Sequence, residues 1–251
     1  MNETYTPGYS PNAVDFMARR SLESHGQFLL PHLKPGLRLL DIGCGPGTIS
    51  MGLAKMVAPG EVLAVDASAR QIEEARRRAK EAGISNIQFQ AESVYALPFR
   101  EGEFDLVFAH ALLEHLQEPL AALGEIRRVL KPGGLAAMRS PDWGGFMLAP
   151  ETPGLDNAIQ QYTNLQTGNG GDVRVGRKLP SLLRKAGFNI KQFSASYECY
   201  DPPALIGEYL AQRLAAAGAI VEAETLRQWS VHPDAVFAQA WCEIVGNRPT
   251  D

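Results

Sequence analysis

Short apolar runs alternate with helix-like segments over the first 140 residues of this chain. The runs cover 37–42, 61–65, 86–91, 104–109 and 135–140, and their length and composition predict strands. Between them, apolar residues at helical spacing predict helices over 48–57, 68–82 and 118–130, the last two ending at a Gly or a Pro-Gly pair. Strands that alternate with helices in this way are typical of parallel βαβ units with right-handed crossovers.

Less regular segments flank this alternation. Residues 1–11 are predicted to be irregular, and a helical pattern over 12–33 ends at Pro35-Gly36. After Ser140 the alternation of predicted strands and helices stops. The segment 141–175 is rich in Pro and Gly, and one helix is expected near 154–166. A helix over 176–186, a strand over 188–197, a mostly helical stretch over 200–231 and a last strand over 235–245 follow.

These elements predict one α/β domain over 1–251 with a doubly wound, seven-stranded, mostly parallel sheet. We expect an N-terminal helical cap at 1–35 and a cofactor-binding core at 36–140. Long insertions beside a sheet are more often functional than plain connectors. We therefore interpret 141–175 and 200–231 as two lids over the carboxyl ends of the strands, where open α/β sheets bind their ligands.

Composition and charge narrow the choice of partners. The chain is 45% hydrophobic and 21% charged, as expected of a globular protein with a full core. A net charge of −4 gives no electrostatic reason to bind nucleic acid or an anionic membrane, so neither is expected as a partner. Three cysteines without a C-x-x-C spacing suggest neither a disulfide framework nor a metal site. Without a signal-peptide pattern or a membrane-length apolar run, the expected location is cytoplasmic; the oligomeric state stays open.

The stretch Leu39–Gly47, LLDIGCGPG, points to a cofactor site. It passes from an apolar run through one acid, Asp41, into a glycine turn that precedes a helix. Its glycines, Gly43, Gly45 and Gly47, have G-x-G-x-G spacing instead of the G-x-G-x-x-G of dinucleotide sites. A carboxylate at Asp41 would face a pyrophosphate unfavourably but would suit a cation. S-adenosylmethionine carries an ammonium group and a sulfonium and has no phosphate.

Further acids follow the next two strands. Asp66 ends the second apolar run and can accept hydrogen bonds from both hydroxyls of a ribose, each worth about 1.5–3 kcal/mol. Glu92 follows the third run, where it can accept from an adenine amino group beside Ser93. Three successive strands that each end in an acid are a stronger signal than one glycine loop.

The sequence resembles the class I S-adenosylmethionine-dependent methyltransferases, and within them the ubiquinone/menaquinone-biosynthesis-like small-molecule group. The resemblance rests on LLDIGCGPG at 39–47, VLAVDAS at 62–68, AESVYALPF at 91–99, FDLVFAHALLEHL at 104–116 and LKPGG at 130–134, in this order. It implies the strand order 3-2-1-4-5-7-6 and a cap made by the N-terminal YTPGYS…FMARR segment. It also implies S-adenosyl-L-methionine as cofactor, with S-adenosyl-L-homocysteine as product.

The resemblance carries over to individual positions. Gln71 would lie near the adenosine, Ala109 would contact the cofactor after the fourth strand, and Arg19 or Arg20 in the cap could pair with the methionine carboxylate beside Tyr5 and Tyr9. The cofactor residues expected in full are Tyr9, Arg20, Asp41, Gly43, Gly45, Gly47, Asp66, Ala67, Gln71, Glu92, Ser93 and Ala109.

Methyl transfer needs a well-placed nucleophile and a dry site, and it needs a base only when the nucleophile is protonated. His110 and His115 flank the turn after the fourth strand and are the candidates for a base or a substrate contact, although either could instead pack or cap a helix. Residues that could line an acceptor pocket are Trp143, Tyr162, Tyr197, Tyr200 and His232. The acceptor atom, O, N or C, is not determined.

Three other hypotheses for the function remain open. A nucleic-acid amino-methyltransferase would place an Asn/Asp/Ser-Pro-Pro-aromatic motif after the fourth strand, where this chain has Ala109-His110-Ala111-Leu112. A non-catalytic, S-adenosylmethionine-binding regulator would keep the same cofactor half. An NAD-dependent dehydrogenase is disfavoured by the glycine spacing.

Overall fold

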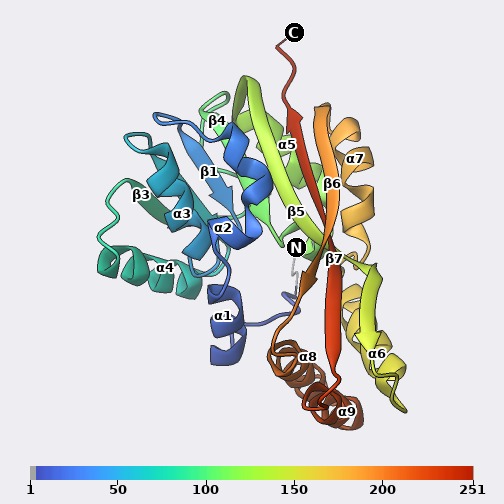
Figure 1. The fold of residues 1–251 in the computed structure, drawn as a ribbon. Helices are drawn as coiled ribbons and strands as arrows, with labels where there is room; N and C mark the ends of the chain where they lie inside the picture. Colours follow the sequence, from blue (N-terminus) through green and yellow to red (C-terminus); the bar gives the residue numbers. More distant parts are fainter. Residues whose placement is uncertain (1–3, 251) are drawn as a thin grey trace.

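The computed structural model describes residues 4–250 and shows one twisted sheet with helices on both faces (Figure 1). Residues 1–3 and 251 of the predicted domain lie outside the described residues. The strands are β1 (Leu39–Ile42), β2 (Val62–Asp66), β3 (Ile87–Ala91), β4 (Phe104–His110), β5 (Leu130–Ala149), β6 (Asn189–Cys199) and β7 (Val236–Asn247). Their order is β3-β2-β1-β4-β5-β7-β6, as predicted, and only the pairs that include β7 are antiparallel.

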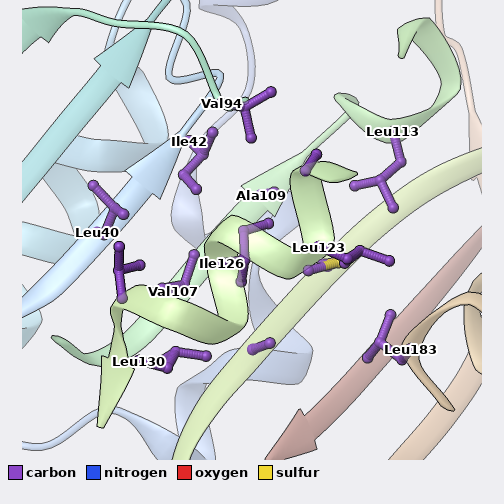
Figure 2. Close-up of a cluster of buried hydrophobic side chains, with 14 of the residues drawn as sticks. Leu40, Ile42, Val94, Val107, Ala109, Leu113, Leu123, Ile126, Leu130 and Leu183 are labelled. Carbon is purple, nitrogen blue, oxygen red and sulfur yellow. The ribbon is translucent and has the colours of Figure 1, made fainter. Parts of the chain in front are cut away.

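Strands β1, β2 and β4 alternate between two apolar clusters because successive side chains of a strand point to opposite faces of the sheet. Leu40 packs under α5 (Pro119–Val129) and α7 (Val175–Lys185), while Leu39 packs under α3 (Thr48–Val57) and α4 (Ala69–Glu81). Figure 2 shows the first of these clusters, which contains Ile126 of α5, Val107 of β4 and Leu40 of β1. Burial on both faces fixes the register and so brings the ends of β1, β2 and β4 to one edge.

The prediction of a helical segment over 12–33 is correct in type but wrong in continuity, because the segment is divided into three short helices. These are α1 (Pro11–Ala18), α2 (Leu22–His25) and the 3₁₀ turn η1 (Gln27–His32). Ser21 interrupts the first pattern because its hydroxyl accepts from Ser24 N and starts a new helix as a capping box. Pro31 then keeps the last piece short.

The prediction that the fifth strand ends at Ser140 is also wrong. Strand β5 continues to Ala149, because Pro141–Asp142 and Phe146–Ala149 pair with residues 236–241 of β7 across a bulge. The helices expected beyond it are present as α6 (Leu155–Gly168), α8 (Ala204–Ala216) and α9 (Ile220–Ser230). With α1 and the extended strand ends, these helices enclose a third apolar cluster on one end of the sheet (Figure 1).

Strand β5 also begins five residues earlier than the predicted 135, at Leu130, whereas the other strand and helix boundaries agree with the sequence to within three residues. Ser68 caps α4 by accepting from Gln71 N, as predicted. None of the helices formed by residues 4–250 has the length and apolar character needed to cross a membrane. In the same residues, no cluster of His, Cys, Asp and Glu is arranged to hold a metal ion.

Candidate functional site

A cavity of about 440 Å³ opens at the carboxyl ends of β1, β2 and β4, beneath the N-terminal segment. The glycine turn forms one wall, the segment after β3 forms another, and the turn after β4 closes the far end. Its lining residues are Tyr5, Tyr9, Met17, Arg20, Asp41–Pro46, Thr48, Ile49, Asp66, Ala67, Gln71, Glu92–Tyr95, Phe108, His110–Leu112, His115 and Leu116.

The glycine turn is fixed by hydrogen bonds to the end of β2. Gly43 N and Cys44 N both donate to Val65 O, at 2.8 and 3.0 Å. Gly45 N donates to Asp66 Oδ2 at 2.9 Å, and Ser68 N donates to Asp66 Oδ1 at the same distance. Each carboxylate oxygen has a second lone pair, so Asp66 can still accept bonds from a ligand. Burial raises its pKa, and the two amide bonds oppose that shift.

Asp41 forms the floor of the cavity beside the turn. Its carboxylate is 2% exposed and accepts a hydrogen bond of 2.5 Å from Ser50 Oγ of α3. Burial raises the pKa of Asp41 to about 7, and the nearby charge of Asp66 adds to the shift. Within residues 4–250, neither carboxylate has an ion pair. The cavity therefore contains two carboxyl groups that lack an ion-pair partner in these residues, an environment that suits a bound cation.

Unsatisfied polar groups lie at the adenosine end predicted from the sequence. Gln71 of α4 is 2% exposed, and both its amide oxygen and its amide nitrogen are buried without a hydrogen-bond partner. Such orphaned groups are costly unless a ligand or water satisfies them. Glu92 and Ser93 line the same end. The donors and acceptors of an adenosine fit this wall.

The predicted cofactor residues all line the cavity except Gly47 and Ala109. Gly47 has φ 77° and begins α3; a Cβ there would lie 2.9 Å from atoms of Ala75 and Phe89. Its role in this structure is thus to let the turn enter the helix. Ala109 is 1% exposed in the core cluster under α5, and its neighbours His110 and Ala111 reach the cavity instead.

His110 lies against a buried polar group on the neighbouring strand. Arg139 of β5 contacts His110 Nε2 at 2.9 Å, and the imidazole stacks on Trp241 with ring centroids 5.1 Å apart. Arginine is only a donor, so Nε2 accepts and the proton of the neutral ring is on Nδ1. Burial and the charges of Arg20 and Arg139 hold the pKa of His110 well below its usual value.

His115 closes the far end with the N-terminal segment. The ring of Tyr5 meets it edge-on at 4.8 Å, and Tyr9 stacks on Tyr5 at 5.3 Å. His115 Nδ1 is buried without a partner, and burial with the charge of Arg20 lowers its pKa to about 3. The ring is therefore neutral and keeps one free acceptor or donor at the cavity end.

Arg20 is the guanidinium in the cavity wall. It is half-buried, makes no ion pair with any carboxylate of residues 4–250, and lies 5.8 Å from the ring centre of Trp241. Arg19, the other predicted arginine, is exposed and does not line the cavity. An anionic ligand group would therefore meet Arg20.

Sequence reasoning missed Glu114, a buried acid on the one-turn helix η2 (Leu113–His115) that lies between the two histidines without lining the cavity itself. It is 2% exposed, and its Oε2 has no hydrogen-bond partner. Burial raises the pKa of Glu114 to about 7, opposed by Ser140, Arg20 and Arg139. In the sequence, Glu114 has the spacing of an ordinary solvent-exposed acid beside apolar neighbours, so no local signal marks it.

The residues proposed for an acceptor pocket do not line this cavity. Trp143 and Tyr162 pack in the third apolar cluster, and Tyr200 packs against it. Tyr197 lies on the outer strand, and His232 is half-exposed near the end of α9. Ala111, which was not predicted, does line the cavity and has φ 53°, a left-handed conformation that favours glycine and often marks functional turns.

Comparisons with known proteins agree with this geometry. A family model described as a methyltransferase domain matches residues 33–187. A protein of Schizosaccharomyces pombe named as an uncharacterized methyltransferase is 36% identical over 181 residues, which are 70% of this chain and 65% of that protein. The ubiquinone biosynthesis O-methyltransferase of Cereibacter sphaeroides is 42% identical over 154 residues, 61% of each protein. The matches span 65% and 45% of the first two curated relatives.

The fold has solved counterparts. A SAM-dependent methyltransferase from Aquifex aeolicus superimposes with a TM-score of 0.59 and 18% identity, over 94% of this chain and 99% of that one. A phosphoethanolamine-type N-methyltransferase from Haemonchus contortus, in complex with S-adenosylhomocysteine, has a TM-score of 0.57 and 18% identity, over 86% of this chain and 50% of that one. These likenesses show the fold.

Proposed function

Because this chain belongs to the methyltransferase domain family, we propose that it transfers a methyl group from S-adenosyl-L-methionine to an O, N or C nucleophile of a small molecule. When bound, the cofactor supplies an electrophilic methyl group on a sulfonium and leaves as S-adenosyl-L-homocysteine. The observation that carries the proposal is a pair of carboxyl groups beside the glycine turn, buried Asp41 and half-buried Asp66, neither of which has a cation partner among the described residues.

The residues of the cavity suit successive parts of that cofactor. Asp66 is oriented by Gly45 and Ser68 to accept from the ribose hydroxyls. Gln71 and Glu92 offer amide and carboxylate groups to the adenine. Asp41 faces the ammonium group, and Arg20 takes the methionine carboxylate. This assignment places one charge of opposite sign against each charged group of the amino-acid moiety.

The acceptor binds beyond the methionine moiety, between the turn after β4 and the N-terminal segment. Tyr5 and Tyr9 cover this end and exclude water, which strengthens the electrostatic contacts within. His115 contacts the acceptor through its free ring nitrogen. His110 is less suited to act as a base, because Nε2 already accepts from Arg139. Catalysis thus relies mainly on placing the nucleophile behind the methyl group.

The acceptor is a small molecule for two reasons. The cavity of about 440 Å³ is enclosed by the N-terminal segment, and the quinone-biosynthesis relatives carry names of small-molecule methyltransferases. The helices α6, α8 and α9 pack in one cluster with Ala13 of α1 and so support the N-terminal segment that covers the cavity.

Two measurements test the proposal in order. Calorimetry with S-adenosyl-L-homocysteine, with NAD as the comparison ligand, tests the cofactor: binding of NAD alone would contradict the proposal. Methyl-labelled cofactor is then incubated with a cell extract divided into small-molecule, nucleic-acid and protein fractions. Label in the small-molecule fraction supports the proposal. Label in RNA or DNA would favour a nucleic-acid methyltransferase, and binding without any transfer would favour a regulator.

A further inference from the structure

The sheet ends at one long strand whose outer edge is uncovered. Strand β6 pairs with β7 alone, and no other strand of residues 4–250 lies beyond it (Figure 1, orange). Its eleven residues are exposed or half-buried throughout, and Phe193 and Tyr197 are 44% and 54% exposed. The opposite edge strand, β3, has only five residues. Long apolar edge strands are pairing sites unless something blocks them.

The direction of the free backbone groups follows from the pairing with β7. Tyr200 N donates to Phe237 O at 3.0 Å, so the even-numbered residues before it direct their amides and carbonyls toward β7. In an antiparallel pair, these groups alternate between the two sides of a strand. The N–H and C=O groups of Phe193, Ala195 and Tyr197 therefore point outward, away from the sheet.

The sequence of this edge is self-complementary about Ala195. On either side of it lie Ser194 and Ser196, then Phe193 and Tyr197, then Gln192 and Glu198. A strand with this symmetry meets like or compatible side chains when it pairs antiparallel with a copy of itself. Antiparallel cross-strand pairs of aromatic and hydroxyl side chains are the stabilising kind.

We propose that β6 pairs antiparallel with β6 of a second copy of this chain, about a two-fold axis at Ala195, so that the two sheets become continuous. In this register Phe193 lies opposite the partner's Tyr197, and Ala195 lies opposite the partner's Ala195. Phe193, Ala195 and Tyr197 all point their backbone groups outward, so the three residue pairs exchange six backbone hydrogen bonds.

The charges of the strand agree with this register. Lys191 is the charged residue nearest to the centre on the amino-terminal side, and it lies opposite the partner's Cys199. Glu198 lies opposite the partner's Gln192, and its carboxylate is already bonded to His25 and Arg139 on its own chain. No like charges oppose one another. An edge protected against pairing would instead carry charges or Pro at its centre.

Sedimentation of the full chain tests the proposal across the micromolar range, where a contact of two strands is expected to associate. The wild type should sediment with twice the 27.3 kDa chain mass at the upper concentrations. The double variant Phe193→Lys, Tyr197→Lys places like charges opposite one another and should weaken association roughly tenfold to a hundredfold. The variant Phe193→Lys, Tyr197→Glu places opposite charges there and should restore the dimer.

This matched pair makes the register itself testable. Both variants change the same exposed positions, so circular dichroism and thermal unfolding should show the wild-type fold in each. A monomeric wild type throughout the range overturns the proposal. It is equally overturned if the Lys/Lys variant dimerises like the wild type, or if the Lys/Glu variant stays monomeric while the wild type dimerises. In the last case the contact would use another surface or another register.

Discussion

Arg139 and His110 form a buried contact in which the guanidinium lies 2.9 Å from Nε2 of the imidazole. The two side chains come from neighbouring strands, β5 and β4, whose register places them side by side. Arg139 is further held by Glu198 and Glu243, at 3.1 and 3.3 Å. The contact therefore converts a histidine at the cavity end into a neutral, oriented ring.

The first prediction concerns the charge of this ring. The pKa of His110 should lie well below 6.5, because protonation would place a cation beside Arg139 and Arg20 in a buried site. Histidine NMR should show the resonances of His110 unchanged from pH 8 to pH 5.5, with the proton on Nδ1, while half-exposed His232 provides the comparison signal. Arg139→Gln should raise the pKa of His110. A titration of wild-type His110 near 6.5 would contradict the contact.

A second prediction tests the ribose assignment. Asp66→Ala should weaken binding of S-adenosyl-L-homocysteine about tenfold to a hundredfold, because at least one charge-assisted hydrogen bond to the ribose is lost. The loss of the bond from Gly45 N, which fixes the glycine turn, adds to the effect. Calorimetry gives the affinity, and Glu73→Ala on the exposed side of α4 is the control. Unchanged affinity in Asp66→Ala would show that the ribose lies elsewhere.

The core of the fold could be predicted because its signals are local. Apolar runs such as 62–65, a cap at Ser68 and glycine turns decide strands and helix ends within a few residues of sequence. The outer half of β5 has no such signal. Residues 142–149 contain Trp143, Gly144 and Gly145, and they form a strand because β7 lies alongside them. The pairing strand, β7, lies almost a hundred residues further along the chain, so no local sequence pattern indicates this pairing.

The residues in and around the site also fall into two groups: those that a local sequence pattern marks and those that it does not. Asp41, Asp66 and Glu92 could be predicted because each directly follows or ends an apolar run, and parallel strands end at one edge. Glu114 and Arg139 could not, because their burial depends on elements distant in sequence: α6 lies against Glu114, and β6 and β7 lie beside Arg139. Gly47 was assigned to the ligand because of its spacing, while its position against Ala75 and Phe89 depends on the packing of α4 and β3.

The third prediction links cofactor binding to the proton of Asp41. With a pKa of about 7, Asp41 is partly protonated at neutral pH, and a bound ammonium group should expel that proton. Affinity for S-adenosyl-L-homocysteine should therefore fall as the pH drops below 7. Calorimetry at pH 7 in two buffers of different ionisation enthalpy should show release of about half a proton per site.

Two comparisons isolate this effect. Asp41→Asn has no proton to release, so its binding heat should lose the buffer dependence. The ligand 5′-methylthioadenosine lacks the ammonium group and should release little from the wild-type protein. If the Asn variant released as many protons as the wild type, another group would be responsible.

The fourth prediction concerns Gly47. Alanine there would adopt φ 77° with its Cβ 2.9 Å from atoms of Ala75 and Phe89, so it combines backbone strain with a clash in the core. Gly47→Ala should lower the free energy of unfolding by about 2–4 kcal/mol. Gly124→Ala on α5, where a Cβ would meet nothing within 4 Å, should leave stability equal or slightly higher. Urea unfolding measures both; equal stabilities would show that the turn is not under this constraint.

The last prediction uses the buried carboxyl of Glu114. Its pKa is raised from 4.5 to about 7, so the folded state binds a proton that the unfolded state releases. The stability due to the protonated group is fully present below pH 4.5 and is lost as the pH rises through 7. Glu114→Gln has no such loss. The unfolding free energy of Glu114→Gln, measured relative to that of the wild type, should therefore rise by on the order of 3 kcal/mol between pH 4.5 and pH 8. Urea unfolding of wild type, Glu114→Gln and the exposed control Glu73→Gln measures it, and a difference that is independent of pH would show that Glu114 has an ordinary pKa in the folded protein.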